Sequence, residues 1–293
     1  MTTAASQPLR VDAGLLWKIV RDTATEWFDA NPFRLAAALA YYTLFSMAPI
    51  LVIAVGVAGS VFGEDAVQGR VFAELRTLFG DEGAAALQKA VIAARLQSNA
   101  FLPTLVGLVG LLIGASAVFA ELQDALNFVW HAKPEALRWS TLLRKRLLSF
   151  AMVLVVGFLL LVSLAISAFL GALGAYVGGY MAVPIGALEL GNFVLSFLIT
   201  TLLFAAIYKV LPDIDIAWHD VAVGAAVTAA LFTSGKSAIG FYLGHSVVAS
   251  TYGAAGALAV LLVWLYYSAL ILFFGAVFTR VYDDTVAAAR RNP

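Results

Sequence analysis

The sequence contains no cysteine, which excludes disulfide bonds, thiolate nucleophiles and cysteine-ligated zinc. Charged side chains are also scarce. They make up 12% of the 293 residues, compared with about 25% in ordinary soluble domains. Hydrophobic residues make up 62%. A chain of this composition cannot cover itself with polar surface, so lipid must be the solvent for most of it.

The charged residues balance to a formal net charge of zero, so no overall field favours nucleic acid as a partner. The three histidines are far apart, and no nucleophile–base pair is visible along the chain. We therefore expect no cofactor, no catalytic residues and no enzymatic activity. The first long apolar run begins at Leu35. It is too long and too far from the start for a signal-peptide core, so we interpret it as a membrane span.

Six apolar stretches are long enough to cross a bilayer. They lie at about 35–62, 101–123, 147–170, 190–210, 218–240 and 253–279. The sequence therefore predicts an all-α, polytopic membrane protein with six transmembrane helices in a domain spanning 35–282.

The remaining segments are too polar to span. Residues 1–34 form a cytoplasmic segment with an amphipathic helix at 11–30, and 283–293 form a cytoplasmic tail. Residues 64–98 carry apolar stripes at helical spacing and predict an amphipathic helical hairpin on the outer face.

The distribution of basic residues predicts the orientation. If both termini lie inside, the two short outer loops carry no basic residue, and the outer basic residues are confined to 64–98. Apart from Lys236 within the fifth predicted span, the inner segments and loops hold the others, namely Arg10, Lys18, Arg21, Arg34, Lys133, Arg138, Arg144, Lys145, Arg146, Lys209, Arg280, Arg290 and Arg291. Cytoplasmic loops are enriched in Lys and Arg. We therefore expect a multi-pass membrane protein with both termini in the cytoplasm.

Lys236 is the one Lys or Arg between residues 221 and 279. An ammonium group inside a membrane span is costly, so it either snorkels to the outer headgroups or faces a cavity that holds an anionic group. Ser234 and Ser237 make the same stretch polar. Tyr266 and Tyr267 add hydroxyls in the last span, where they either join helices or line a pocket. These five residues are the candidate substrate-binding set.

A second polar group lies where the predicted spans meet the cytoplasm. Glu121, Asp124 and Asn127 recur at helical spacing, and Asp213 and Asp220 flank the start of the fifth span. The first three are either a solvated helix end or an inner gate paired with Arg144, Lys145 or Arg146. The aspartates are explained by helix capping, with a metal site as the less favoured alternative.

Several motifs resemble the YihY/BrkB family of bacterial inner-membrane proteins. They are 35–46 with Pro49, 115–119, 122–127 with Trp130, Pro212-Asp213 with Trp218 and Asp220, Gly235-Lys236, 252–256, and 264–275. The resemblance covers roughly residues 30–282. It implies six transmembrane helices, a location in the bacterial cytoplasmic (inner) membrane, and a role in transport or lipid handling. The family was once labelled ribonuclease BN, a label later regarded as misassigned.

The sequence departs from that pattern at Val277, where relatives often have glutamate. This removes an acidic partner for Lys236 from the last span. We expect a transporter or flippase-like protein for an amphipathic or anionic lipid or envelope precursor. The alternative is a membrane scaffold that uses Gly107, Gly110 and Gly114 to bind a partner. A metal-dependent nuclease or hydrolase ranks third. Expected partners are membrane lipids and a second copy of the chain, not nucleic acid.

Overall fold

The computed structural model describes residues 13–63, 101–132, 185–245 and 248–291, together with residue 151 and parts of the 64–98 insertion. Those parts are 68–69, 71–73, 75–76, 84–85, 87–89 and 91–92. All regular secondary structure in these residues is α-helix, so the predicted all-α class is confirmed. The predicted third span, at 147–170, lies outside the described residues except for residue 151.

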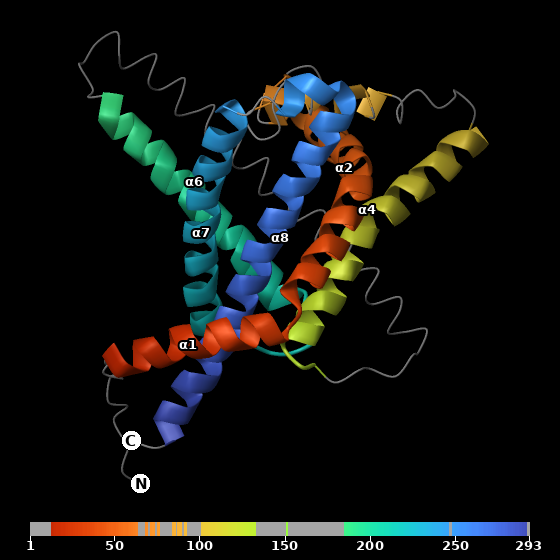
Figure 1. Ribbon diagram of the computed structural model, residues 1–293. Coiled ribbons are helices and arrows are strands. Elements are labelled where there is room, and N and C mark those ends of the chain that lie inside the picture. The colour runs from red at the N-terminus through yellow and green to blue at the C-terminus, as the bar shows by residue number, and fades with distance from the viewer. Residues whose placement is uncertain are drawn as a thin grey trace.

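Besides the described parts of the insertion, the structure contains six long helices (Figure 1). They are α1 (Ala13–Asp29), α2 (Pro32–Phe62), α4 (Phe101–Val129), α6 (Ile185–Val210), α7 (Trp218–His245) and α8 (Val248–Arg291). The helices from α2 onward contain the other five predicted spans. Within the described residues, three stretches are long and apolar enough to cross a membrane, at Pro32–Val52, Phe193–Val210 and Leu258–Ala288. The count of six spans stays a prediction.

Helix α8 is the central element of the bundle (Figure 1). It packs against α2 and α7. Helix α4 packs on α2, and α6 packs on α7. Two helix pairs, α2/α4 and α6/α7, therefore flank α8. Helix α1 crosses one end of the bundle and packs mainly on α8. We call this the α1 end, and the opposite end the insertion end.

Helix α8 continues to Arg291, through residues that were predicted to form the cytoplasmic tail, 283–293. Thr285 and Val286 are buried there, which gives the last turns a packing partner. Helix α1 itself is two-sided. Ile19 and Thr23 are buried, whereas Trp17, Val20 and Phe28 are exposed. Exposed apolar groups on a helix of this kind suit a membrane interface, in agreement with the predicted amphipathic helix.

Helices α2 and α4 approach closely where α2 contains Pro49. A β-carbon added to Gly114 would lie 3.1 Å from Cγ of Pro49, so the glycine permits this contact. The Ser46 hydroxyl is buried and donates to the Gly114 carbonyl. This hydrogen bond joins α2 to α4.

Helices α6, α7 and α8 are joined by a buried polar contact. The Tyr208 hydroxyl donates to the Leu272 carbonyl over 2.7 Å and lies 3.1 Å from the Thr228 hydroxyl. Tyr208 and Thr228 are both fully buried. A β-carbon on Gly275 would overlap the Thr228 side chain. Glycine is therefore required at 275 for the three helices to approach this closely.

The described parts of the 64–98 insertion are helical and form a second apolar cluster. Leu75, Leu87 and Val91 are buried in it, as the predicted stripes require, and Phe72 joins them. The cluster includes Leu261 and Trp264 of α8, and it packs against Leu44, Met47 and Leu51 of α2. The insertion is thus attached to α2 and α8 by its apolar side.

Candidate functional site

The connection between α6 and α7 is bound to α4 through one aspartate. Asn127 Nδ2 donates to Asp213 Oδ2 over 2.7 Å, and Gln123 Nε2 donates to Asp213 Oδ1 over 3.1 Å. The Asp213 backbone N–H donates to Asn127 Oδ1 over 2.8 Å. We call Gln123, Asn127 and Asp213 the Asp213 latch. It lies at the α1 end of the bundle.

Local sequence explains why the latch forms. Gln123 and Asn127 are four residues apart on α4, so their side chains share one face. Leu211 and Pro212 are buried and end α6, because proline cannot continue a helix. The next residue, Asp213, is thereby directed at α4. Gln123 is buried, so its amide requires a partner, and the Asp213 carboxylate supplies one.

The latch includes two of the five predicted gate residues, Asn127 and Asp213. Sequence reasoning missed Gln123, although its spacing of four from Asn127 was a usable signal. Asp124 is exposed and Glu121 half-buried, and neither is among the latch donors. Asp220 is buried in the first turn of α7, and its carboxylate lies 3.3 Å from His219 Nδ1. The alternative partners Arg144, Lys145 and Arg146 lie outside the described residues.

The same connection is held from its other side by Lys209. Its ammonium group pairs with Asp215 and donates to the Ile216 carbonyl over 2.6 Å. The nitrogen also lies 5.7 Å from the centre of the Trp218 ring. The hydrogen bond and charge of Lys209 lower the pKa of the exposed Asp215 carboxyl below its ordinary value. The α6–α7 connection is therefore fixed by α6 as well as by α4.

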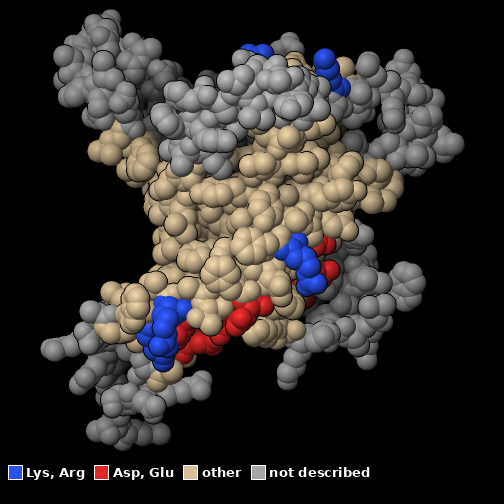
Figure 2. Space-filling view, in the orientation of Figure 1, with Lys and Arg blue, Asp and Glu red and all other residues tan. Residues whose placement is uncertain are grey.

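Arg280 joins three helices at the α1 end. Its side chain is 12% exposed and pairs with Glu26 of α1. It also donates to the Val129 carbonyl at the end of α4, and it lies 3.1 Å from His131 Nδ1. From the sequence, Arg280 was predicted only to be one of the basic residues on the inner side. Nothing in the local pattern indicated Glu26, Val129 or His131 as its partners. Figure 2 shows the charged side chains on this face above and below a broad uncharged band.

The predicted substrate-binding residues lie on α7 and α8. Lys236 and Ser234 are exposed, and Tyr266 and Tyr267 are half-buried. A β-carbon on Gly235 would meet the Tyr267 ring at 2.6 Å, so this tyrosine packs directly on α7. The side chain of Ser237 lies outside the described residues. Lys236 is thus a cation on the surface of the described helices, next to a tight α7–α8 contact.

A metal site was the less favoured alternative that the sequence left open for Asp213 and Asp220. Among the residues that the structure describes, no group of three or more His, Cys, Asp or Glu could hold a metal ion. The Asp213 carboxylate instead accepts hydrogen bonds from the side-chain amides of Gln123 and Asn127. At the α1 end, hydrogen bonds and ion pairs join the helix pairs to one another and to α1.

Comparison with known proteins places this architecture in a family. The family described as "Virulence factor BrkB" matches residues 23–293. A UPF0761 membrane protein from Tolumonas auensis is 30% identical over 88% of this chain and 82% of its own length. One from Mannheimia succiniciproducens is 28% identical over 88% of this chain and 87% of its own length.

A third UPF0761 membrane protein, from Rhodospirillum centenum, is 29% identical over 91% of this chain. The matched region covers 57% of that relative's length, so this chain spans little more than half of it. No solved structure is significantly similar to the chain. The family match covers most of the chain and agrees with the apolar helices, so this chain is a membrane protein of the Virulence factor BrkB family, the YihY/BrkB family that its motifs resemble.

Proposed function

We propose that this protein is a transporter or flippase-like protein for an amphipathic, anionic lipid or envelope precursor, with the Asp213 latch as its inner gate. The observation that carries the proposal is the hydrogen bonding of Asp213 to Gln123 and Asn127. It joins the α2/α4 pair to the α6/α7 pair. The basic residues favour the cytoplasmic side for this end.

The helix arrangement supports a gate at this position. Helices α4 and α6 come together at the α1 end and diverge toward the insertion end (Figure 1). Each helix pair packs on α8, so the two pairs can move relative to each other about α8. A hydrogen bond to a charged group contributes about 1.5–3 kcal/mol net. The latch is therefore strong enough to favour a closed state and weak enough to open during a transport cycle.

Lys236 supports an anionic substrate. It lies 18 residues after the start of α7 at Trp218, or about 27 Å along the helix at 1.5 Å per residue. The bilayer core is about 30 Å thick. An exposed ammonium at this depth is placed to meet a lipid phosphate from within the membrane. Ser234, two residues earlier on α7, is also exposed.

Reconstitution in liposomes tests the proposal. We expect the protein to move fluorescent phosphatidylglycerol between leaflets faster than phosphatidylcholine, and Lys236→Ala to slow this movement. Asp213→Asn should change the rate because it weakens both amide contacts. Asp215→Asn, in the same connection but outside the latch, is the matched control and should retain the parent rate. The proposal fails if the parent protein moves no lipid and Lys236→Ala fully rescues a deletion strain.

A scaffold role is the second candidate, and one feature of α4 favours it. A β-carbon on Gly110 would meet no atom within 4 Å, and its neighbours Val109 and Ile113 are exposed. This outward face differs from Gly114, which packs on Pro49. Cysteine crosslinking from Ile113 in cells would trap one stable partner if the protein is a scaffold. Robust lipid movement by the isolated protein would argue against that role.

A further inference from the structure

Helices α7 and α8 pack through two glycine–threonine contacts that mirror each other. Thr228 of α7 lies against Gly275 of α8, and Thr279 of α8 lies against Gly224 of α7. A β-carbon on either glycine would overlap the threonine of the other helix. Both threonines are fully buried. Each helix therefore places a threonine in the gap left by a glycine of its neighbour, a close packing that small residues allow in membrane helices.

The two threonines are held in position by their own helices. Thr228 donates to the Gly224 carbonyl over 2.7 Å, and Thr279 donates to the Gly275 carbonyl over 2.7 Å. Glycine and threonine are four residues apart on each helix, so both lie on the face where the helices meet. Sliding or rotating one helix would move each threonine out of its gap and against the opposite backbone. Close-packed interfaces do not deform continuously, so α7 and α8 are fixed in one register.

Tyr208 joins α6 to the same contact. Its hydroxyl donates to the Leu272 carbonyl of α8 over 2.7 Å and lies 3.1 Å from the Thr228 hydroxyl of α7. One turn earlier on α6, the Phe204 ring lies 5.7 Å from the Phe232 ring of α7, measured between ring centres. Tyr208 is fully buried, so separating the helices would leave its hydroxyl without a partner. One side chain thus holds three helices together.

We propose that α6, α7 and α8 form one rigid unit, and that the Asp213 latch opens by movement of α4, together with α2, against this unit. We call these three helices the α6–α8 unit. The inference rests on the proposed gate and adds which parts move, because it assigns α8 to the same part as α6 and α7.

Helices α2 and α4 form the other part. Ser46 of α2 donates to the Gly114 carbonyl of α4, and Pro49 packs on the same glycine. Helix α2 also packs on α8, where Leu39 of α2 and Phe273 of α8 belong to one apolar cluster. Apolar contacts have no preferred direction, so they tolerate a small rotation better than the buried hydroxyl contacts of the α6–α8 unit. Movement between α2 and α8 therefore requires the least disruption.

At the α1 end, the two parts meet through contacts that opening must break. Besides the latch, Arg280 of α8 donates to the Val129 carbonyl of α4. The Trp130 ring, which follows α4, lies 5.9 Å from the Tyr208 ring between ring centres. All three contacts are made by the last turns of α4 or the residue after it. They can therefore separate together when this end of α4 moves.

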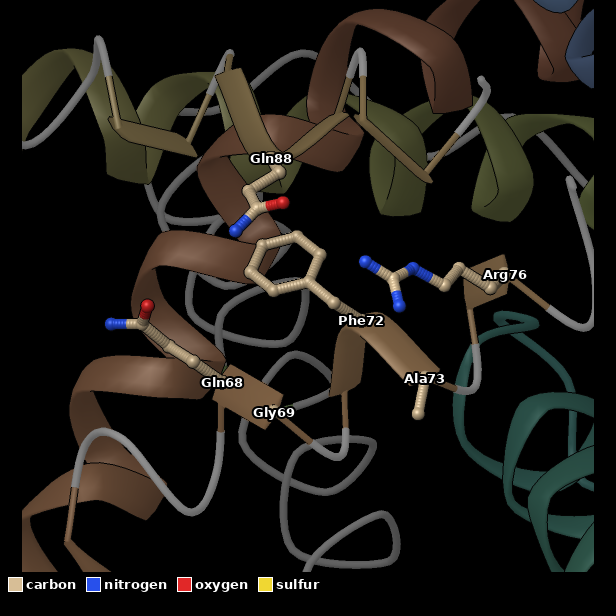
Figure 3. Close-up of a pocket in the computed structure, with 6 residues that line it drawn as sticks. All are labelled: Gln68, Gly69, Phe72, Ala73, Arg76 and Gln88. Atoms are coloured by element: carbon tan, nitrogen blue, oxygen red, sulfur yellow. The ribbon is translucent and has the colours of Figure 1, made fainter. Parts of the chain in front are cut away.

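The insertion holds the two parts together at the opposite end. Figure 3 shows the Phe72 ring of the insertion beside the side chains of Gln88 and Arg76. Phe72 is buried in the apolar cluster that includes Trp264 of α8 and packs against Met47 of α2. This cluster contacts both parts at the insertion end, whereas the latch joins them at the α1 end. Opening should therefore displace α4 most at the α1 end.

Distances between pairs of spin labels on the full-length protein in lipid nanodiscs test the proposal. The chain has no native cysteine, so labels can be attached at chosen exposed positions. Labels at Leu202→Cys of α6 and Val263→Cys of α8 report within the α6–α8 unit, and labels at Phe128→Cys of α4 and Leu202→Cys report between the two parts. Asn127→Ala removes two hydrogen bonds of the latch. We expect it to lengthen and broaden the 128–202 distance and to leave the 202–263 distance unchanged.

Two further variants complete this measurement. Asp215→Asn, in the same connection but outside the latch, is the matched control and should change neither distance. Where Asn127→Ala fails to fold, Asp213→Asn takes its place, because it weakens both amide contacts of the latch.

Gly224→Ala tests the rigidity of the unit from within. Its β-carbon would overlap Thr279, so labels at Leu231→Cys of α7 and Val263→Cys of α8 should give a broader distance distribution than in the parent. Gly191→Ala on α6 is the matched control, since a β-carbon there meets no atom within 4 Å. Where Gly224→Ala fails to fold, Tyr208→Phe removes only a hydroxyl and should broaden the 202–263 distance.

Two results would overturn the proposal. One is a 202–263 distance that changes in Asn127→Ala as much as the 128–202 distance, because α8 would then not move with α6. The other is a 128–202 distance that stays unchanged in both latch variants, because α4 would then keep its place without the latch. Spin-label distances report helix positions and not lipid movement. A protein that gives the expected distances but moves no lipid would refute the transport proposal and leave the α6–α8 unit standing.

Discussion

Asn127 makes two hydrogen bonds with Asp213, donating to the carboxylate over 2.7 Å and accepting from the backbone N–H over 2.8 Å. One side chain of α4 thereby satisfies both the charged group and the main chain of the α6–α7 connection. Gln123 adds a third bond from the adjacent turn. The stability of this end of the bundle should depend strongly on a single amide.

Asn127→Ala should lower the free energy of unfolding by about 2–4 kcal/mol, since it removes two hydrogen bonds, one of them to a charged group. Thermal unfolding in detergent measures the change. Thr200→Ala is the control, because Thr200 donates only to Ser196 within α6. Its effect should stay within about 0.5 kcal/mol. Similar losses in both variants would contradict the special role of the latch.

Gly275→Ala and Gly110→Ala should change stability in opposite directions. A β-carbon at 275 would overlap Thr228, whereas one at 110 meets no atom within 4 Å. Overpacking costs about 1–3 kcal/mol, and an alanine in place of an unobstructed helical glycine stabilises by up to about 1 kcal/mol. Melting temperatures of the two variants provide the comparison. Equal melting temperatures would argue against the close approach of α7 and α8.

Arg280→Ala should loosen α1 from the bundle, because it removes the ion pair with Glu26 and the bond to Val129. The chain has no native cysteine, so single cysteines can report exposure. Cysteine at the buried position Ile19 should react with a maleimide faster in the variant than in the parent. Cysteine at the exposed position Thr25 should react alike in both. An unchanged rate at position 19 would show that apolar contacts alone hold α1.

The Lys209–Asp215 pair should give a small dependence of stability on pH. The pKa of Asp215 is lowered in the folded protein from an ordinary value of 3.8. The ion pair therefore contributes its full stabilisation when the pH is above that ordinary value. This stabilisation is lost as the pH falls through the lowered pKa of the folded protein. Asp215→Asn should reduce stability slightly at neutral pH and remove this acid-side dependence. Melting temperatures of parent and variant should converge as the pH decreases below about 4. A constant difference would contradict the ion pair as its cause.

Individual residues show how far sequence reasoning could reach. Pro212 predicts the end of α6, and the stripe of Leu75, Leu87 and Val91 predicts the buried side of the insertion. Both follow from local rules of backbone geometry and periodicity. Asn127 and Asp213 were each candidates, but 86 residues separate them. No local rule states that they meet, because helix order in the bundle decides it.

Composition and periodicity by themselves determined that this chain is an all-α membrane protein, where five long helices lie, and the amphipathic character of α1 and the insertion. These properties depend on the solvent and on spacing along one helix. Only the tertiary structure decided that Ser46 bonds to α4, that Arg280 joins α1 to α4 and α8, and that Asp213 is held by Gln123 and Asn127. Such contacts depend on the relative rotation and height of separate helices, which packing sets and no single segment encodes.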